Sequence, residues 1–147
     1  MTSVDALKLG TRASPLALAQ AHEVRDLLAR QHPHLAEPGA VEIVEIKTTG
    51  DRVQDRALSE VGGKGLFSKE IDAAQCDGRI DIAVHSMKDL ETRLAPGIEL
   101  TAALTREDVR DVFISTRAAS LAELPAGCRV GTSSLRRQAQ ILHRRPD

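Results

Sequence analysis

Two hydrophobic periodicities alternate along this sequence of 147 residues, and together they predict an α/β fold. Short β-branched or alternating runs are typical of strands, which we expect at 7–11, 41–46, 80–84, 98–104 and 112–115. Apolar residues three and four positions apart are typical of helices, which we expect at 15–32, 66–77 and 134–145, with one helical turn at 120–124. The first helix has clear boundaries, because Ser14 can cap it, Pro15 suits its first position and Pro33 ends it.

The charge pattern divides the chain. A charged run at 106–111 interrupts the strand and helix signals, so we expect residues 1–104 to form most of a first domain and 105–147 to begin a second. The last strand and helix have no partner strand after them in the sequence. We therefore expect the second unit to be incomplete.

Composition narrows the classes of partner. The formal charge of −1 gives no global attraction for nucleic acid or an anionic membrane, and an aromatic content of 1% offers no platform for stacking bases. Cys76 and Cys128 lie far apart and match no metal-binding or redox spacing, so we expect free thiols in a reducing cytoplasm and no metal site. The first residues lack the apolar core of a signal peptide.

A glycine-rich segment, VGGKGLF at 61–67, is the first candidate site. Glycines let a backbone approach an anion closely, and Lys64 supplies a point charge. The segment is no Walker loop, because no Ser or Thr follows the lysine at the required position. The alternative is a surface turn before a helix.

The second candidate, HSMKD at 85–89, follows a strand that reads as buried. Ligands in open α/β sheets bind outside the carboxyl ends of strands, so its position favours a site. Asp89 could protonate a leaving amine or stabilise a developing cation. The alternative is a solvated ion pair between Lys88 and Asp89. A lone histidine is more often structural, and we expect this of His85.

The third candidate, GTSSLRR at 131–137, opens the last helix. Arg136 and Arg137 lie in its first turn, where the helix dipole disfavours cations, and this conflict favours an anionic ligand. The alternative is a plain hydroxyl cap with solvated arginines. Arg12 and Ser14 form a similar start on the first helix.

Four segments in order resemble the porphobilinogen deaminase (hydroxymethylbilane synthase) family: GTRASPLA at 10–17, VGGKGLF at 61–67, DIAVHSMKD at 81–89 and VGTSSLRR at 130–137. The family condenses four porphobilinogen units head to tail, with release of ammonia, on a covalently held dipyrromethane primer. The resemblance covers about residues 9–147 and implies tetrapyrrole biosynthesis as the pathway. It also implies a monomeric parent enzyme.

The resemblance assigns roles to residues. It implies that Asp89 is the catalytic carboxylate and that Ser86 and Lys88 contact pyrrole side chains or cofactor. Lys64 matches a mobile loop near the active-site cleft. The positions that match binders of cofactor and substrate carboxylates are Arg12, Ser14, Thr132, Ser133, Ser134, Arg136 and Arg137.

The family fold consists of two periplasmic-binding-protein-like (type II) domains around a cleft, with a small third domain. The resemblance implies that here the second domain is truncated, the third is absent, and the cysteine that carries the primer lies beyond residue 147. We therefore expect a fragment that is inactive alone. Glu91 and Val109 replace prolines usual in the family, which loosens the local backbone.

Two other classes remain open: a module that binds a small anion without chemistry, and a degraded paralogue that only interacts with proteins. Asp89 counts against a pure anion binder, because its charge repels such a ligand. The missing signal peptide counts against a secreted binding protein.

Overall fold

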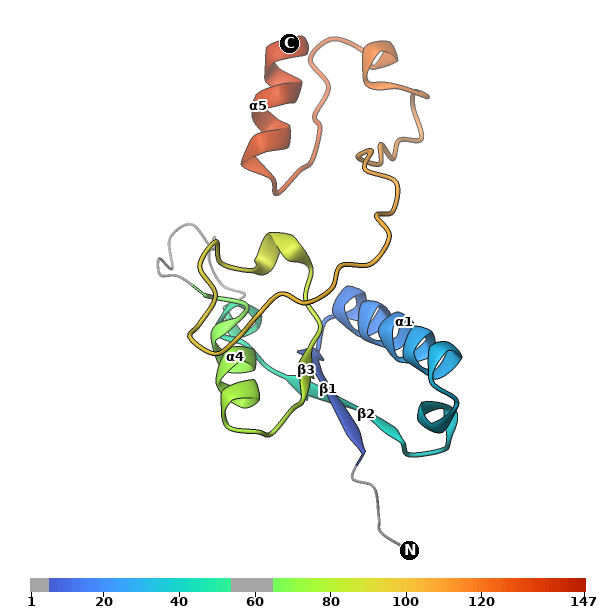
Figure 1. The fold of residues 1–147 in the computed structure, drawn as a ribbon. Helices are drawn as coiled ribbons and strands as arrows, with labels where there is room; N and C mark the ends of the chain where they lie inside the picture. Colours follow the sequence, from blue (N-terminus) through green and yellow to red (C-terminus); the bar gives the residue numbers. More distant parts are fainter. Residues whose placement is uncertain (1–5, 54–64) are drawn as a thin grey trace, which may run out of the picture. The chain divides into compact units, whose positions relative to one another are not determined.

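The computed structural model describes residues 6–53 and 65–147 (Figure 1). Contacts divide the chain into two compact units, Met1–Ala102 and Ala103–Asp147. The assignment of these two units to two enzyme domains stays a prediction.

A small parallel sheet organises the first unit, so the predicted α/β class is confirmed. Its strands are β1 (Leu7–Arg12), β2 (Val41–Ile46) and β3 (Ile82–Ala83), in the order β2-β1-β3. β1 pairs with both neighbours in parallel, with Leu9 opposite Ile43 on one side and Ile82 on the other. The central strand is therefore the one nearest the N-terminus.

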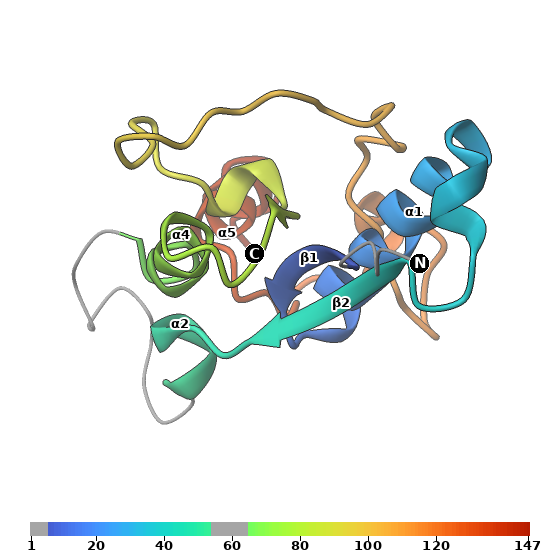
Figure 2. The same cartoon turned by 60° about the horizontal axis from the view of Figure 1, so that its bottom comes forward.

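Helices cover both faces of this sheet (Figures 1 and 2). α1 packs against β1 and β2, and α4 packs against β1 and β3. Shorter helical turns connect the larger elements. The helical segments are α1 (Pro15–Gln31), η1 (Pro33–Ala36), α2 (Thr49–Arg52), α4 (Lys69–Cys76) and η2 (Met87–Asp89).

Alternation along β1 directs its side chains to the two helical layers. Leu9 and Thr11 are fully buried, and the Thr11 hydroxyl donates to the carbonyl of Ala17 in α1. Gly10 points to the other face, where a Cβ would lie 2.2 Å from Cδ1 of Ile80. By the same alternation, Arg12 extends on the α4 face. The main core cluster also lies on that face and consists of Ile71, Ala74 and Ile80, with Val44, Ile46 and Ala83 packed against it.

The start of α1 confirms the sequence prediction. Ser14 has extended backbone angles, and its Oγ accepts a hydrogen bond from the N–H of Ala17 at 3.3 Å. Pro15 occupies the first helical position. Helix α1 ends at Gln31, just before Pro33.

Two elements of the first unit are shorter than predicted. The helix expected at 66–77 begins at Lys69, because Gly65, at a φ of 68°, opens a turn whose carbonyl accepts from Ser68 and Lys69. The strand expected at 80–84 is reduced to Ile82–Ala83. Its flanking residues still bond to β1, with Asp81 N–H donating to Lys8 and Val84 N–H to Gly10.

The second unit contains two helical elements, η3 (Leu121–Glu123) and α5 (Leu135–Arg144), close to the predicted turn and helix. None of its residues, all of which the structure describes, is buried. The strands predicted at 98–104 and 112–115 are wrong. Val112 and Ile114 keep the expected alternating pattern, yet they are 82% and 90% exposed, and no strand of the described residues pairs with them.

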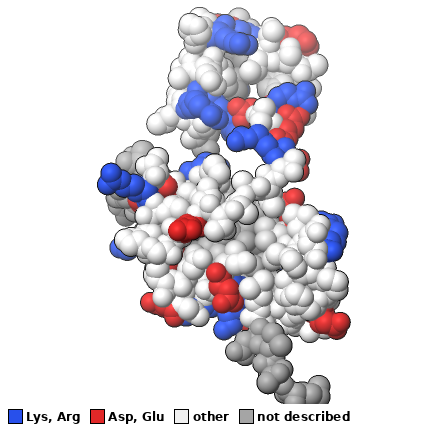
Figure 3. All heavy atoms as spheres, in the orientation of Figure 1, with Lys and Arg blue, Asp and Glu red and all other residues white. Residues whose placement is uncertain are grey.

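On the face of the second unit that Figure 3 shows, charged side chains of both signs are interspersed. Arg110 pairs with Asp108, and Arg145 pairs with Asp147. Among residues 6–53 and 65–147, no helix combines the length and apolar character that crossing a membrane requires.

Candidate functional site

A polar pocket lies at the carboxyl ends of the strands. The chain leaves β1 for β2 on one side and then returns to β3 on the other, and such a switch in strand order opens a crevice at that edge of a parallel sheet. The pocket has a volume of about 310 Å³, near the lower limit for small-molecule sites. Its lining residues are Arg12, Ser14, Leu16, Ala17, Phe67, Val84, His85, Ser86, Lys88 and Asp89.

Three elements supply the polar groups of this pocket. Arg12 is the last residue of β1, and Ser14 caps the helix that follows. The segment 84–89 continues from β3 and ends in η2, which includes Asp89. The structure therefore brings together Arg12, Ser14, Ser86, Lys88 and Asp89, which the sequence had placed in two separate motifs.

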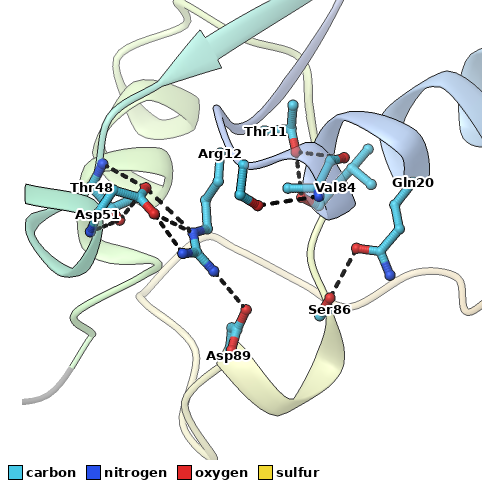
Figure 4. A network of polar contacts seen from close by, with 10 residues as sticks. Thr11, Arg12, Gln20, Thr48, Asp51, Val84, Ser86 and Asp89 are labelled. Carbon is cyan, nitrogen blue, oxygen red and sulfur yellow. Dashed lines mark hydrogen bonds and ion pairs between the residues drawn. The ribbon is translucent and has the colours of Figure 1, made fainter. Parts of the chain in front are cut away.

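The Arg12 guanidinium lies between two carboxylates (Figure 4). Nη2 donates to Oδ1 of Asp51 at 2.5 Å, and Nε donates to the same oxygen at 3.1 Å. Nη1 donates to Oδ2 of Asp89 at 3.0 Å. The ring of Phe67 lies against the guanidinium, with its centroid 4.0 Å from Cζ. The guanidinium of Arg12 is thus held by Asp51 along its Nε and Nη2 edge, by Asp89 at Nη1 and by Phe67 on one face.

Asp51 is itself fixed by a capping box at the start of α2. Its Oδ2 accepts from the backbone N–H of Thr48 at 3.2 Å and from the Thr48 hydroxyl at 2.7 Å. Burial alone raises the pKa of Asp51, but hydrogen bonds from Arg12 and Thr48 outweigh burial and lower the pKa below its ordinary value. Asp51 is therefore an ionised anchor for the guanidinium at neutral pH.

The partner of Asp89 differs from the one that the sequence suggested. Asp89 pairs with Arg12, and the two side chains are 15% and 19% exposed. Lys88, the partner of Asp89 in the alternative of a solvated ion pair, is exposed and lines the same pocket. Asp89 is consequently a partly buried carboxylate whose position depends on β1.

Hydroxyl groups join the walls of the pocket. Ser86 donates to Oε1 of Gln20 in α1 at 2.9 Å, and Thr11 lies 3.4 Å from the carbonyl of Val84 (Figure 4). Both contacts connect the segment after β3 with β1 or α1. The segment that carries Asp89 is therefore held to the rest of the first unit at several points.

His85 lies in the same segment and is largely withdrawn from solvent. Its Nε2 is buried and has no hydrogen-bond partner within the described part of the chain. Burial lowers the pKa of His85, and the nearby Asp72 and Asp89 oppose this only in part. For Asp72, burial raises the pKa. Neutral His85 fits the structural role that we expected from the sequence.

The third motif lies in the second unit, at the start of α5. Ser134 Oγ accepts from the N–H of Arg137 at 3.3 Å, and Thr132 Oγ1 accepts from the N–H of Ser134 at 3.2 Å. Arg137 forms an ion pair with Asp111 at 2.6 Å. Asp111 thus balances one of the two cations that the helix dipole disfavours. Ser133 and Arg136 are exposed at the same helix start.

Several residues in or next to the first pocket were not predicted as site residues, and the lysine of the first motif is not tested. Lys64 lies outside the described residues. Phe67 was part of the glycine-rich segment without a role of its own, and Gln20 gave no signal. Thr48 and Asp51 do have a signal in the sequence, because a Thr followed three residues later by an acidic residue is close to a capping box.

The fold and the pocket together define an α/β domain of the parallel class with a polar pocket at the carboxyl ends of its strands, where such folds bind ligands. The family model described as "Porphobilinogen deaminase, dipyromethane cofactor binding domain" matches residues 7–147. The chain belongs to this porphobilinogen deaminase family.

Curated relatives agree with this assignment. The chain is 64% identical over 143 residues to "Porphobilinogen deaminase, chloroplastic" of Oryza sativa subsp. japonica, which covers 97% of the chain and 40% of the relative. It is 61% identical over 139 residues to "Porphobilinogen deaminase" of Nitrobacter winogradskyi, which covers 95% of the chain and 43% of the relative. The chain thus spans well under half of the length of these relatives.

Proposed function

We propose that the protein containing this chain catalyses the porphobilinogen deaminase reaction. Four porphobilinogen units are joined head to tail, each with release of ammonia, and water then releases hydroxymethylbilane for tetrapyrrole biosynthesis. Membership of the family over residues 7–147 supports this proposal. The observation that carries it is the partly buried Asp89 carboxylate, aligned by Arg12 in a pocket at the carboxyl ends of the strands.

The residues of the pocket fit a dipyrromethane cofactor. This group carries carboxylate side chains, two flat pyrrole rings and pyrrole N–H groups. Lys88 and the Ser14 hydroxyl can take the carboxylates, as can Ser86 once its hydroxyl turns away from Gln20, and Leu16 and Phe67 provide apolar surface for a ring. When bound, the cofactor supplies the pyrrole end to which the first substrate unit is joined.

Asp89 has two tasks in this proposal. Its carboxylate accepts a hydrogen bond from a pyrrole N–H, and its negative charge stabilises the substrate's methylene carbon as that carbon becomes electron-poor on loss of ammonia. Arg12 keeps the carboxylate pointed into the pocket. The partly buried setting strengthens the effect, because a carboxylate there is screened less by water.

We assign the second unit a supporting role. Thr132, Ser133, Ser134, Arg136 and Arg137 would bind carboxylates of the substrate or of the growing chain. The dipole at the helix start and the exposed Arg136 in its first turn support this assignment. Lys64 would act beside the same ligands. Residues 1–104 and 105–147 would belong to two type II periplasmic-binding-protein-like domains.

We further propose a cytoplasmic monomer as the working form. The exposed Cys76 and the half-buried Cys128 are both free thiols, as in a reducing compartment. Fractionation of the cells that naturally make the protein tests its location. Recovery of the protein only from an organelle would contradict a cytoplasmic location.

The decisive experiment measures porphobilinogen consumption and ammonia release by the full-length protein and its Asp89→Asn variant. We expect turnover in the parent and a loss of about 100-fold or more in the variant, with cofactor still attached, because the amide has no charge to offer. Asp77→Asn, which alters an exposed ion pair of the same unit, is the matched control. A protein that binds porphobilinogen without consuming it would be a binding module instead.

A further inference from the structure

Two segments hold Arg12 from two sides: α2, which follows β2, and the turn before α4. Asp51 engages the Nε and Nη2 edge of the guanidinium, and Phe67 covers its face. Phe67 can lie there because Gly50, beside Asp51, has no side chain. A Cβ on Gly50 would lie 2.2 Å from Cε1 of the ring.

This arrangement fixes the one guanidinium tip that faces Asp89. Arginine has five N–H groups in a planar fork, so a carboxylate on the Nε and Nη2 edge sets the direction of Nη1. Nη1 then meets Asp89 at 3.0 Å. Without the contact to Asp51, the long Arg12 side chain could adopt other rotamers, and the Asp89 contact would be made only part of the time.

The charges of Arg12, Asp51 and Asp89 also indicate that Arg12 orients Asp89. A guanidinium between two carboxylates leaves the group with a net negative charge, so Arg12 does not neutralise the pocket. The side chains of Arg12 and Asp51 are both 19% exposed, a setting in which a bidentate pair orients its members better than a solvated one does. Thr48 adds two hydrogen bonds to Asp51 and keeps it from rotating away.

We propose that Asp51 is a positioning residue for the reaction: through Arg12 it sets the orientation of the Asp89 carboxylate. The inference rests on the proposed function. Asp51 does not line the pocket, so its effect should appear in the rate of the chemical step and not in substrate binding.

The kinetic test compares Asp51→Asn with Asp51→Glu in the full-length protein with its cofactor attached. We expect Asp51→Asn to lower kcat by about 10- to 100-fold with little change in KM, since a misplaced catalytic group costs rate at this scale. Asp51→Glu restores the charge and should recover part of the loss. Asp77→Asn should match the parent. Unchanged kcat in Asp51→Asn, or an effect on KM alone, overturns the proposal.

A second readout needs no turnover. Nuclear magnetic resonance of the protein without substrate reports hydrogen exchange at Nε–H of Arg12, identified by the loss of its signal in Arg12→Lys. We expect slow exchange in the parent and in Asp77→Asn, and faster exchange in Asp51→Asn. Equal exchange in the parent and Asp51→Asn overturns the proposal.

Thr48→Val keeps the test decisive if Asp51→Asn does not fold, as judged by circular dichroism. Valine has nearly the shape of threonine but cannot hold Asp51 through a hydroxyl, so we expect a smaller fall in kcat and faster exchange at Arg12. Parental values for both in Thr48→Val overturn the proposal.

A parent protein that consumes no porphobilinogen contradicts the proposed function, whereas an active parent equalled by the Asp51 variants contradicts only the role of Asp51.

Discussion

The guanidinium of Arg12 donates from Nη1 to Oδ2 of Asp89 at 3.0 Å, although 77 positions separate the two residues in the sequence. One residue ends the central strand, and the other lies in the turn after an edge strand. Their contact turns two sequence motifs into one pocket. It also makes the stability of the first unit depend on charges at the site.

Arg12→Ala should destabilise the first unit at neutral pH. The change leaves Asp51 and Asp89 close together, partly buried and without their cation. We expect a loss of about 1–3 kcal/mol in the free energy of unfolding, less than for a fully buried pair because water reaches both side chains. Urea denaturation measures it, with Arg25→Ala, from an exposed pair, as the control. A loss no larger than that of the control would contradict the prediction.

The same variant should respond to acid in a defined direction. The fold lowers the pKa of Asp51, so the stability that Asp51 contributes is present above the ordinary value of 3.8 and is lost as pH falls through the lower folded value. Arg12→Ala removes the main donor behind this shift. The difference in unfolding free energy between parent and variant should therefore shrink below pH 3.8, and a constant difference would count against this explanation.

Gly50→Ala should strain the contact with Phe67. The new methyl group would overlap the ring, and forcing an extra carbon into a packed site costs about 1–3 kcal/mol of stability. Thermal unfolding of Gly50→Ala, Phe67→Leu and the double variant forms a cycle, and we expect the glycine change to cost less when the ring is gone. Gly131→Ala, which meets no atom within 4 Å, is the control. Additive effects in the cycle would exclude the proposed overlap.

His85 should make the first unit sensitive to mild acid. Because burial lowers the folded pKa of His85, the unfolded chain binds its proton first as pH falls through 6.5. Stability should fall from that pH downward, and His85→Gln should reduce the slope. Asp72 acts in the opposite direction nearer its ordinary value of 3.8, since burial raises its pKa. Denaturation at several pH values tests this, with the exposed His22→Gln as the control; an unchanged slope in His85→Gln would refute it.

Variants of Ser14 should separate its role in helix capping from its role in ligand binding. Ser14→Ala removes the acceptor for the Ala17 N–H and should cost about 1 kcal/mol of stability. Ser14→Asp keeps a capping acceptor and adds a favourable charge at the helix start, so stability should hold. The same charge in the pocket should weaken binding of carboxylated pyrroles. Calorimetry of porphobilinogen binding, beside thermal unfolding, measures both; tighter binding by Ser14→Asp would be the contrary result.

Local signals in the sequence predicted local structure well. Ser14 and Pro15 mark the start of α1 because capping and the φ of proline act within one turn. The strand before His85 placed the segment 85–89 at a carboxyl end, because parallel strands share their direction. These inferences needed no knowledge of which strands are neighbours.

Pairings between distant segments could not be predicted in the same way. The contact between Arg12 and Asp51 depends on the register that sets Arg12 opposite Ile46, and no periodicity specifies that register. Val112 and Ile114 show the opposite case, in which a strand was predicted from the sequence but does not form. Their alternation is typical of a strand, but a strand forms only where another strand supplies hydrogen bonds, and none does so among the described residues.

The central position of β1 has a consequence for the order of folding. Leu7 pairs with Val41, whereas Leu9 pairs with Ile82, so the ladder to β3 closes a much longer stretch of chain than the ladder to β2. Closing the longer stretch costs more chain entropy and is slower. We therefore expect β1, α1 and β2 to assemble first, and the pocket to form only when β3 joins. Hydrogen exchange during refolding should protect Val44 before Val84.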